Sequence, residues 1–213
     1  MAPITIAYIS LLSALIPIGA GVFQWRRLSG NLKLLVCIPI AAILADSISL
    51  LLLNNRINTW PILNLFFVIQ FVLLFLILSH GRKLVNLKIV FYACLAFAII
   101  NYLFIQTPQT FNSYTAYVGG ILIILTSLNF LYQLLVERPV EKIQTLPLFW
   151  VAFGALIYHA GTLFLFLFNN YLLAHQLETH QTIWILHNML NISKNGFLFI
   201  AIWMSYKGRI SLQ

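Results

Sequence analysis

Two ionisable side chains of opposite charge lie deep inside apolar stretches of this 213-residue chain. Lys194 is the only basic residue in the middle of such a stretch, and Asp46 is the only acidic one. A charge near the centre of a bilayer costs at least about 2.5–3.5 kcal/mol, and residues of this kind tend to be paired and functional. A lysine and a carboxylate in an apolar interior can form an ion pair, exchange protons or bind a polar ligand.

Two further polar side chains are predicted to lie at the same depth as this lysine and this carboxylate. Gln70 lies near the middle of its apolar stretch, and Asp46 and His159 lie within three residues of the middle of theirs. At about 1.5 Å per residue, these three side chains and Lys194 share a slab about one helical turn thick. The shared depth predicts a polar cluster near the membrane midplane.

The last apolar stretch carries a polar face of its own. His187, Asn191 and Lys194 follow i, i+4, i+7 spacing, which places them on one side of a helix. Phe197 is expected on the opposite, lipid-facing side. Histidine titrates near neutral pH when solvated, so this face adds proton-responsive groups. We predict one site that binds a small ligand or responds to protons, formed by Asp46, Gln70, His159, His187, Asn191 and Lys194.

Two interpretations of this cluster are open from the sequence. In the first, Asp46 pairs with Lys194 and the other groups bridge helices, so that the cluster only stabilises the fold. In the second, the cluster lines a buried pocket or path. Interhelical hydrogen bonds in membranes average well under 2 kcal/mol, so a purely structural role rarely needs a full charge. The sequence therefore favours the pocket.

The elements that must position these residues are long apolar stretches. Hydrophobic residues make up 62% of the chain and charged residues 8%, as expected of a protein whose solvent is lipid. About 20 residues cross the hydrocarbon as a helix. The chain is predicted to be all-α, with a single seven-helix transmembrane domain over residues 1–213 and no soluble domain. The predicted spans are Ile4–Phe23, Leu34–Leu53, Pro61–Ser79, Ile89–Gln106, Tyr114–Leu135, Pro147–Phe168 and Thr182–Met204.

The charges outside the spans predict an orientation. The connections after spans one, three and five, together with the C-terminal tail, hold ten lysines and arginines, whereas the opposite connections hold only Arg56. By the positive-inside rule the N-terminus is outside and the C-terminus inside. The predicted location is a membrane that the chain crosses several times. Because the net charge of +8 is dispersed at helix ends, no nucleic acid partner is expected.

A weak internal repeat suggests a 3+1+3 arrangement of parallel triplets. Spans two and six each end in a pair of asparagines, and spans three and seven open with Trp60 and Trp184, each followed four residues later by an asparagine. In this register Gln70 corresponds to Lys194. The length and arrangement resemble the SWEET sugar carriers and the PnuC vitamin carriers, although the motifs of neither family are present. A small-solute or ion transporter is therefore an alternative function.

A lysine in the last of seven helices also suggests retinal bound to Lys194 as a Schiff base. The resemblance to microbial rhodopsins does not extend further. The third span of those proteins carries an acidic counter-ion, whereas Gln70 stands in this third span. Retinal binding by a rhodopsin-like protein is therefore a third possible function.

Catalytic and metal chemistry are not expected. The sequence has no Ser-His-Asp, paired-carboxylate or Cys-His arrangement with sensible spacing, which predicts that the protein is not an enzyme. Cys37 and Cys94 lie in apolar stretches and are interpreted as packing residues. His175, Glu178 and His180 have the ligand types of a metal site but are interpreted as a solvated connection. No metal and no cofactor is predicted.

Several motifs resemble those of a largely uncharacterised family of small seven-helix inner-membrane proteins of Bacteroidetes-type bacteria. They are residues 111–115 (FNSYT), residues 147–150 (PLFW) with Gly154 and Tyr158, and residues 183–187 (IWILH) followed by Asn191. Members are similar to stand-alone sensory membrane domains, and some occur beside histidine kinases. The resemblance implies a signal-input role with a cytoplasmic histidine kinase as partner. It names no ligand and transfers no site residue.

Overall fold

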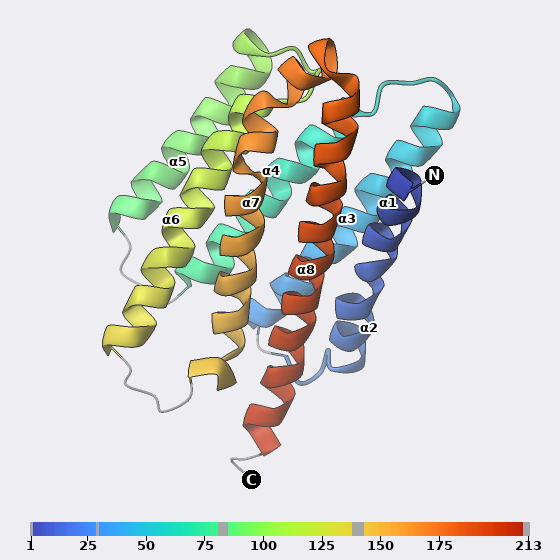
Figure 1. The fold of residues 1–213 in the computed structure, drawn as a ribbon. Coiled ribbons are helices and arrows are strands. Elements are labelled where there is room, and N and C mark those ends of the chain that lie inside the picture. The colour runs from blue at the N-terminus through green and yellow to red at the C-terminus, as the bar shows by residue number, and fades with distance from the viewer. Residues whose placement is uncertain (1, 29, 81–84, 138–142, 211–213) are drawn as a thin grey trace.

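A computed structural model of the chain describes residues 2–28, 30–80, 85–137 and 143–210 (Figure 1). These residues form helices joined by short connections, and no strand occurs among them. The elements are α1 (Ala2–Ser13), α2 (Leu15–Phe23), α3 (Gly30–Asn54), α4 (Trp60–Ser79), α5 (Val85–Ile100), the π-helical turn η1 (Asn101–Ile105), α6 (Ser113–Glu137), the 3-10 turn η2 (Ile143–Thr145), α7 (Pro147–His175) and α8 (Leu177–Ile210).

The eight α-helices of the described residues correspond to the seven predicted spans. α1 and α2 together cover the first predicted span, and α5 continues into η1 along the fourth. The all-helical prediction is confirmed, and most ends agree within a few residues. The largest differences are in the last hairpin: α7 continues past Phe168 to His175, and α8 starts before Thr182 and continues past Met204. A single residue, Gln176, separates these two helices.

Six of the described segments are long and apolar enough to cross a membrane, namely Thr5–Phe23, Gly30–Asn54, Trp60–Ser79, Asn86–Ile105, Ser113–Val136 and Pro147–His175. They indicate a multi-pass membrane protein. α8 is not among them, since histidine, asparagine and lysine side chains interrupt its apolar sequence. Its membrane crossing stays a prediction, supported by its position alongside α7 (Figure 1).

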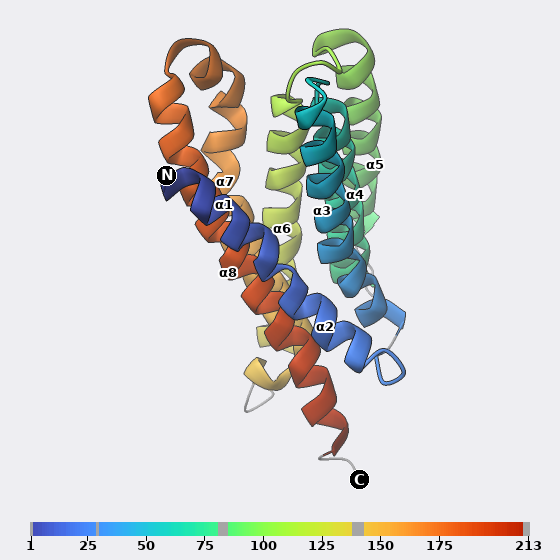
Figure 2. The same cartoon turned by 90° about the vertical axis from the view of Figure 1, so that its right-hand side faces the viewer.

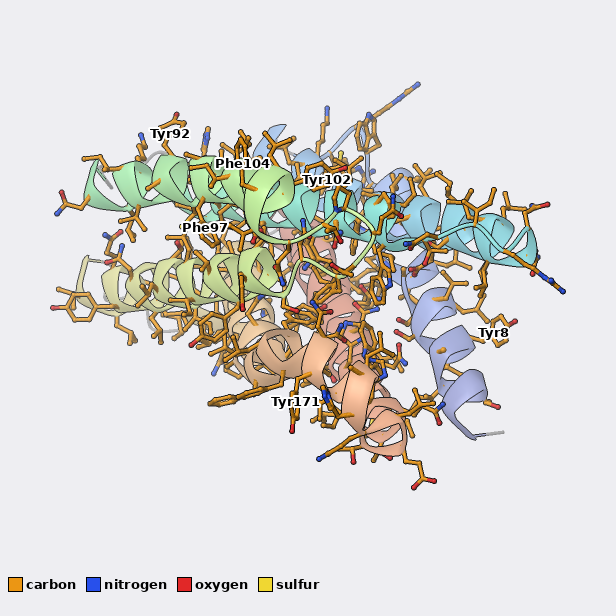
Figure 3. The ribbon with its side chains drawn as sticks, turned by 90° about the horizontal axis from the view of Figure 1, so that it is seen from above. Tyr8, Tyr92, Phe97, Tyr102, Phe104 and Tyr171 are labelled. Carbon is orange, nitrogen blue, oxygen red and sulfur yellow. The ribbon has the colours of Figure 1, made fainter. Side chains whose placement is uncertain are left out.

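Exposed aromatic side chains such as Tyr92 and Tyr171 lie on the outside of the bundle (Figure 3), as a lipid-facing surface requires.

A proline divides the first span into α1 and α2. Pro17 has no N–H to donate to the carbonyl of Ser13, and its ring crowds that carbonyl, which ends α1 at Ser13. The Ser13 hydroxyl instead donates to the Ser10 carbonyl at 2.6 Å. Pro39 lies inside α3, which continues through it. The first span therefore has a break that the other long helices lack.

The helices form two groups that meet through α6 (Figure 2). α7 and α8 form one hairpin and α3 and α4 another, with α6 packed against both α7 and α4. α1 and α2 run diagonally across α8, and α2 also reaches α3. One end of the bundle, here called the basic end, carries Arg26, Arg27, Lys33 and Lys88 in or beside its connections, and Arg56 lies at the opposite end.

Arg26, Arg27, Lys33 and Lys88 thus lie at one end as predicted, with Arg56 at the other, while the side of the membrane that each end faces stays a prediction. Four more bases of the predicted set, Arg82, Lys83, Arg138 and Lys142, lie outside the described residues. The 3+1+3 repeat also stays a prediction.

Close packing joins α7 and α8 both near the basic end and midway along the two helices. A Cβ added to Gly154 of α7 would lie 2.6 Å from the Cβ of Phe197, and one added to Gly161 would lie 2.6 Å from Cδ1 of Leu190. The absence of a side chain at these glycines lets α7 and α8 approach each other closely. Phe197 packs against Gly154 of α7 and stacks on Trp150, and it is half-buried, so it contacts α7 and also reaches the surface that the sequence predicts to face lipid.

Candidate functional site

The buried lysine of α8 is hydrogen-bonded to an amide of α4. Lys194 Nζ donates to Gln70 Oε1 at 3.0 Å, and both residues are buried, with 4% and 1% of their surface exposed. The same ammonium lies 4.3 Å from the ring centroid of Tyr158 on α7, within cation–π range. Gln70 and Lys194 thus lie together, as their equal depth along the helices predicts. Three helices thus meet at one charge.

Asp46 is not the direct partner of Lys194. No oxygen of Asp46 lies within 4.0 Å of a lysine, arginine or histidine nitrogen among the described residues. The two groups still interact through their charges at longer range. The ion-pair interpretation is therefore wrong in this structure. Equal depth does not imply contact, because the Lys194 side chain points toward α4 and α7 while Asp46 stands on α3.

The Asp46 side chain lines an open cleft of about 830 Å³ between α1, α3, α4 and α8. The cleft extends from Leu53, Thr59 and Gln181, near the end opposite the basic end, to Asp46 and Asn191 about halfway along the bundle. Its volume lies in the range of small-molecule sites, about 300–1,000 Å³. Most of its wall is apolar or aromatic, and a few polar groups converge near its inner end. This is the usual composition of a small-molecule site.

Two predicted residues of α8 form part of the cleft wall. His187 Nε2 lies 3.1 Å from the Tyr158 hydroxyl, and its Nδ1 is buried with no hydrogen-bond partner among the described residues. Asn191 Nδ2 donates to the Ser10 hydroxyl of α1 at 2.9 Å. One turn deeper, Asn195 Nδ2 donates to the Ser13 hydroxyl at 2.8 Å. The polar face of α8 thus both lines the cleft and holds α1.

His159 lies outside the cleft. It is 5% exposed, and within the described ranges neither ring nitrogen has a hydrogen-bond partner. It borders a separate cavity of about 20 Å³ between α4, α6 and α7, which is also lined by Gln70 and Thr115. That volume suits about one water molecule. A Cβ on Gly120 would lie 3.7 Å from His159 Nδ1, so the glycine helps to keep this space open.

Of the six predicted residues, the structure therefore places Asp46, His187 and Asn191 on the cleft wall and Gln70 and Lys194 directly behind it. His159 faces a different cavity. The residue that joins these parts was not predicted. Tyr158 lines the cleft, faces Lys194 with its ring and reaches His187 with its hydroxyl.

A signal for Tyr158 is present in the sequence. It precedes His159 in the middle of an apolar stretch, and a tyrosine there must find a partner for its hydroxyl. Ser10 and Ser13 were missed as well, although their i, i+3 spacing and position in the first span mark a polar contact face.

At the far end of the cleft, a polar cluster closes the turn between α7 and α8. Trp184 Nε1 lies 2.9 Å from His180 Nε2 and 3.2 Å from Asn169 Oδ1. Partial burial lowers the pKa of His180, which favours the neutral ring that can accept the Trp184 N–H. His180 thus contributes to the fold here, together with Asn170, whose amide donates to the Phe111 carbonyl at 2.8 Å.

Fold and site together define a helical multi-pass membrane protein with a ligand-sized cleft that ends at a polar centre. No protein-family model matches the chain, no curated protein matches it, and no solved structure matches it. The resemblance to the seven-helix family thus stays an expectation, and the candidate site rests on geometry alone.

Proposed function

We propose that this protein is a membrane sensor or receptor-like module whose cleft binds a small ligand. The observation that carries the proposal is the continuity between the cleft and the buried charge. Tyr158 forms part of the cleft wall, and its ring lies against Lys194, which is hydrogen-bonded to Gln70. A ligand at the wall would act on a group that ties together α4, α7 and α8.

The proposed signal is a change in how these helices pack. A ligand shifts a conformational equilibrium only if it interacts differently with the two states. A charged or hydrogen-bonding ligand near Asp46 and His187 would do so, since it changes the field at Lys194 and competes for the Tyr158 hydroxyl. In the predicted orientation the ligand enters from outside, and the basic end presents the response to a cytoplasmic partner such as a histidine kinase.

Transport by a SWEET-like or PnuC-like route is the second candidate function. One observation favours it, because a cleft that is open from one end to mid-depth has the shape of one state in alternating access. The other half of the bundle is filled by fully buried residues such as Leu35, Ile38 and Ile202. Transport would require this core to open, whereas sensing requires only a shift within it. We therefore place sensing first.

Retinal binding receives the least support. The Lys194 amine is not part of the cleft wall, and it is occupied by Gln70 and the Tyr158 ring. A Schiff-base lysine needs its nitrogen directed into the chromophore cavity.

Capture of the partner from native membranes tests the sensor proposal. We expect a tagged chain, crosslinked before extraction, to co-purify with a histidine kinase. Tyr158→Phe removes the hydroxyl that faces His187 and should change the basal autophosphorylation of that kinase. Tyr132→Phe makes the same change at a side chain that is 65% exposed on α6, and it should have no effect.

Two results would contradict the sensor proposal. One is the absence of any cytoplasmic partner after crosslinking. The other is uptake of a labelled solute into liposomes that is lost in Lys194→Met, a result that would make transport the first candidate.

A further inference from the structure

We infer that the cleft selects an organic cation with an apolar body, such as a lipophilic amine or quaternary ammonium compound. This inference rests on the proposed function, because it assumes that the cleft binds a ligand. It adds the chemical class of that ligand. Three features of the cleft favour such a ligand: one charge in its wall, the aromatic rings around that charge and the position of the opening.

Among the described residues that line the cleft, Asp46 alone carries a formal charge at neutral pH when histidine is neutral. It has no ion-pair or hydrogen-bond partner among the described residues. Lys194 lies behind Tyr158 rather than in the wall, and its ammonium already has Gln70 and an aromatic face. A carboxylate in a largely apolar site is costly without a counter-charge. A cationic ligand would supply that counter-charge.

Aromatic rings surround the same space. Tyr8 comes from α1, Phe66 and Phe67 from α4, Tyr158 from α7 and Trp184 from α8. The faces of such rings attract cations, and this is how proteins recognise quaternary ammonium groups. The same rings provide apolar area for the body of the ligand. One anionic group and several rings together favour a cation over a neutral apolar compound.

The opening of the cleft fits a ligand that arrives from the membrane. Tyr8, Leu50 and Leu53 line the cleft and are also 53%, 41% and 63% exposed. Tyr8 lies in the angle between α1 and α3 (Figure 3). The mouth is therefore bounded by lipid-facing side chains of these two helices. A lipophilic cation, which concentrates in bilayers, can reach Asp46 by this route.

Other ligand classes fit less well. An anion would be repelled by Asp46. A phospholipid acyl chain would place hydrocarbon against a carboxylate and leave its charge without a partner. A sugar would present many hydroxyl groups to a wall that is mostly apolar and aromatic.

Three probes of matched shape test the class of ligand. Tetraphenylphosphonium is a cation, tetraphenylborate is an anion and triphenylphosphine oxide is neutral. Their equilibrium binding to the purified chain in lipid nanodiscs should differ, with empty nanodiscs as the blank for partition into lipid. We expect saturable binding of the phosphonium at least tenfold tighter than that of either other probe.

Two variants of α3 locate the selectivity. Asp46→Asn keeps the shape and removes the charge, and it should weaken phosphonium binding at least tenfold. Ser47→Ala changes an exposed residue of the same helix, next to Asp46, that is not part of the cleft wall. It should alter binding less than twofold. Thermal unfolding of both variants should match that of the parent chain, which confirms that each is folded.

The outcomes separate the two proposals. The cation inference is overturned if the borate or the neutral probe binds as tightly as the phosphonium. It is also overturned if Asp46→Asn binds the phosphonium as tightly as the parent chain does. In both cases ligand binding by the cleft still stands. If none of the three probes binds saturably, the ligand-binding role of the cleft is overturned together with the inference.

Discussion

The two halves of this bundle are built from the same helices but are packed differently. Near the basic end, α7 and α8 approach closely at Gly154, where Phe197 packs, and residues such as Leu35 and Ile202 are fully buried. In the other half, α1 is held to α8 by serine and asparagine side chains, and a cleft remains between α1 and α3. A small membrane protein can thus keep a cleft open beside a packed core: the cleft half has its own buried cluster around Phe111, Tyr158 and Phe166, while polar contacts hold α1 at the margin of the cleft.

The break in the first span explains part of this difference. Gly21 of α2 lies against Val36 of α3 with no room for a Cβ, so the segment near the basic end is fixed to the tightly packed half. On the other side of Ala14, α1 continues along α8, which α2 also contacts, and has few contacts with α3. Pro17 thus separates a packed segment from a segment that borders the cleft.

The largest effect is expected at the boundary between the halves. Gln70→Leu leaves the buried ammonium of Lys194 without its acceptor and should lower the free energy of unfolding by about 2–3 kcal/mol. Lys194→Met should cost less, since it removes the charge itself. The double variant should therefore be more stable than the sum of the single effects predicts. The free energy of unfolding in mixed micelles is measured for the parent chain, the two single variants and the double variant, and it gives the coupling between Gln70 and Lys194. Simple additivity would show that the two residues do not act as a pair.

A smaller effect is expected from one methyl group in the packed half. Gly154→Ala would place a Cβ 2.6 Å from the Cβ of Phe197 and should destabilise the protein by about 1–2 kcal/mol. Gly196→Ala is the matched control, because nothing lies within 4 Å of a Cβ there and alanine is the better helix former. Thermal unfolding should separate the two variants. Equal stabilities would mean that α7 and α8 are not in close contact.

The smallest effect is expected in the cleft half. Ser10→Ala combined with Ser13→Ala removes two hydrogen bonds to α8 and should cost about 1 kcal/mol, because such bonds in membranes average about 0.6 kcal/mol. Ser47→Ala, at an exposed position of α3, should have no measurable effect. The same unfolding assay applies. A loss above 3 kcal/mol would show that α1 is part of the tightly packed core.

The sequence predicts the helices well because apolar length alone determines them. The stretch that contains Lys194 is predicted as a helix from its length, and it is helical as predicted, although its polar residues keep it below a simple hydropathy criterion for a membrane span. Depth along the helices also predicts that Gln70 and Lys194 lie together. The depth of a residue along a helix can be predicted from the sequence, because each residue adds a fixed rise along the helix axis.

Rotation about each helix axis is not readable in the same way, because packing against neighbours sets it. For this reason Asp46 and Lys194 share a depth without direct contact, and half-buried Phe197 packs against α7 as well as reaching the surface. Successive residues of a helix point about 100° apart. Tyr158 consequently faces the cleft while His159 faces α6, although the sequence placed only His159 in the site.

The straight course of α8 has a mechanical consequence. It has 34 residues and no proline, so it is a rod about 50 Å long, which exceeds the roughly 30 Å of hydrocarbon. Lys194 lies near the centre of the rod, and its bond to Gln70 fixes it there, with Asn195 and Phe197 held close by. A rod fixed at its centre is a lever. A small outward tilt at the cleft becomes an opposite displacement at the basic end, without any change in the helix itself.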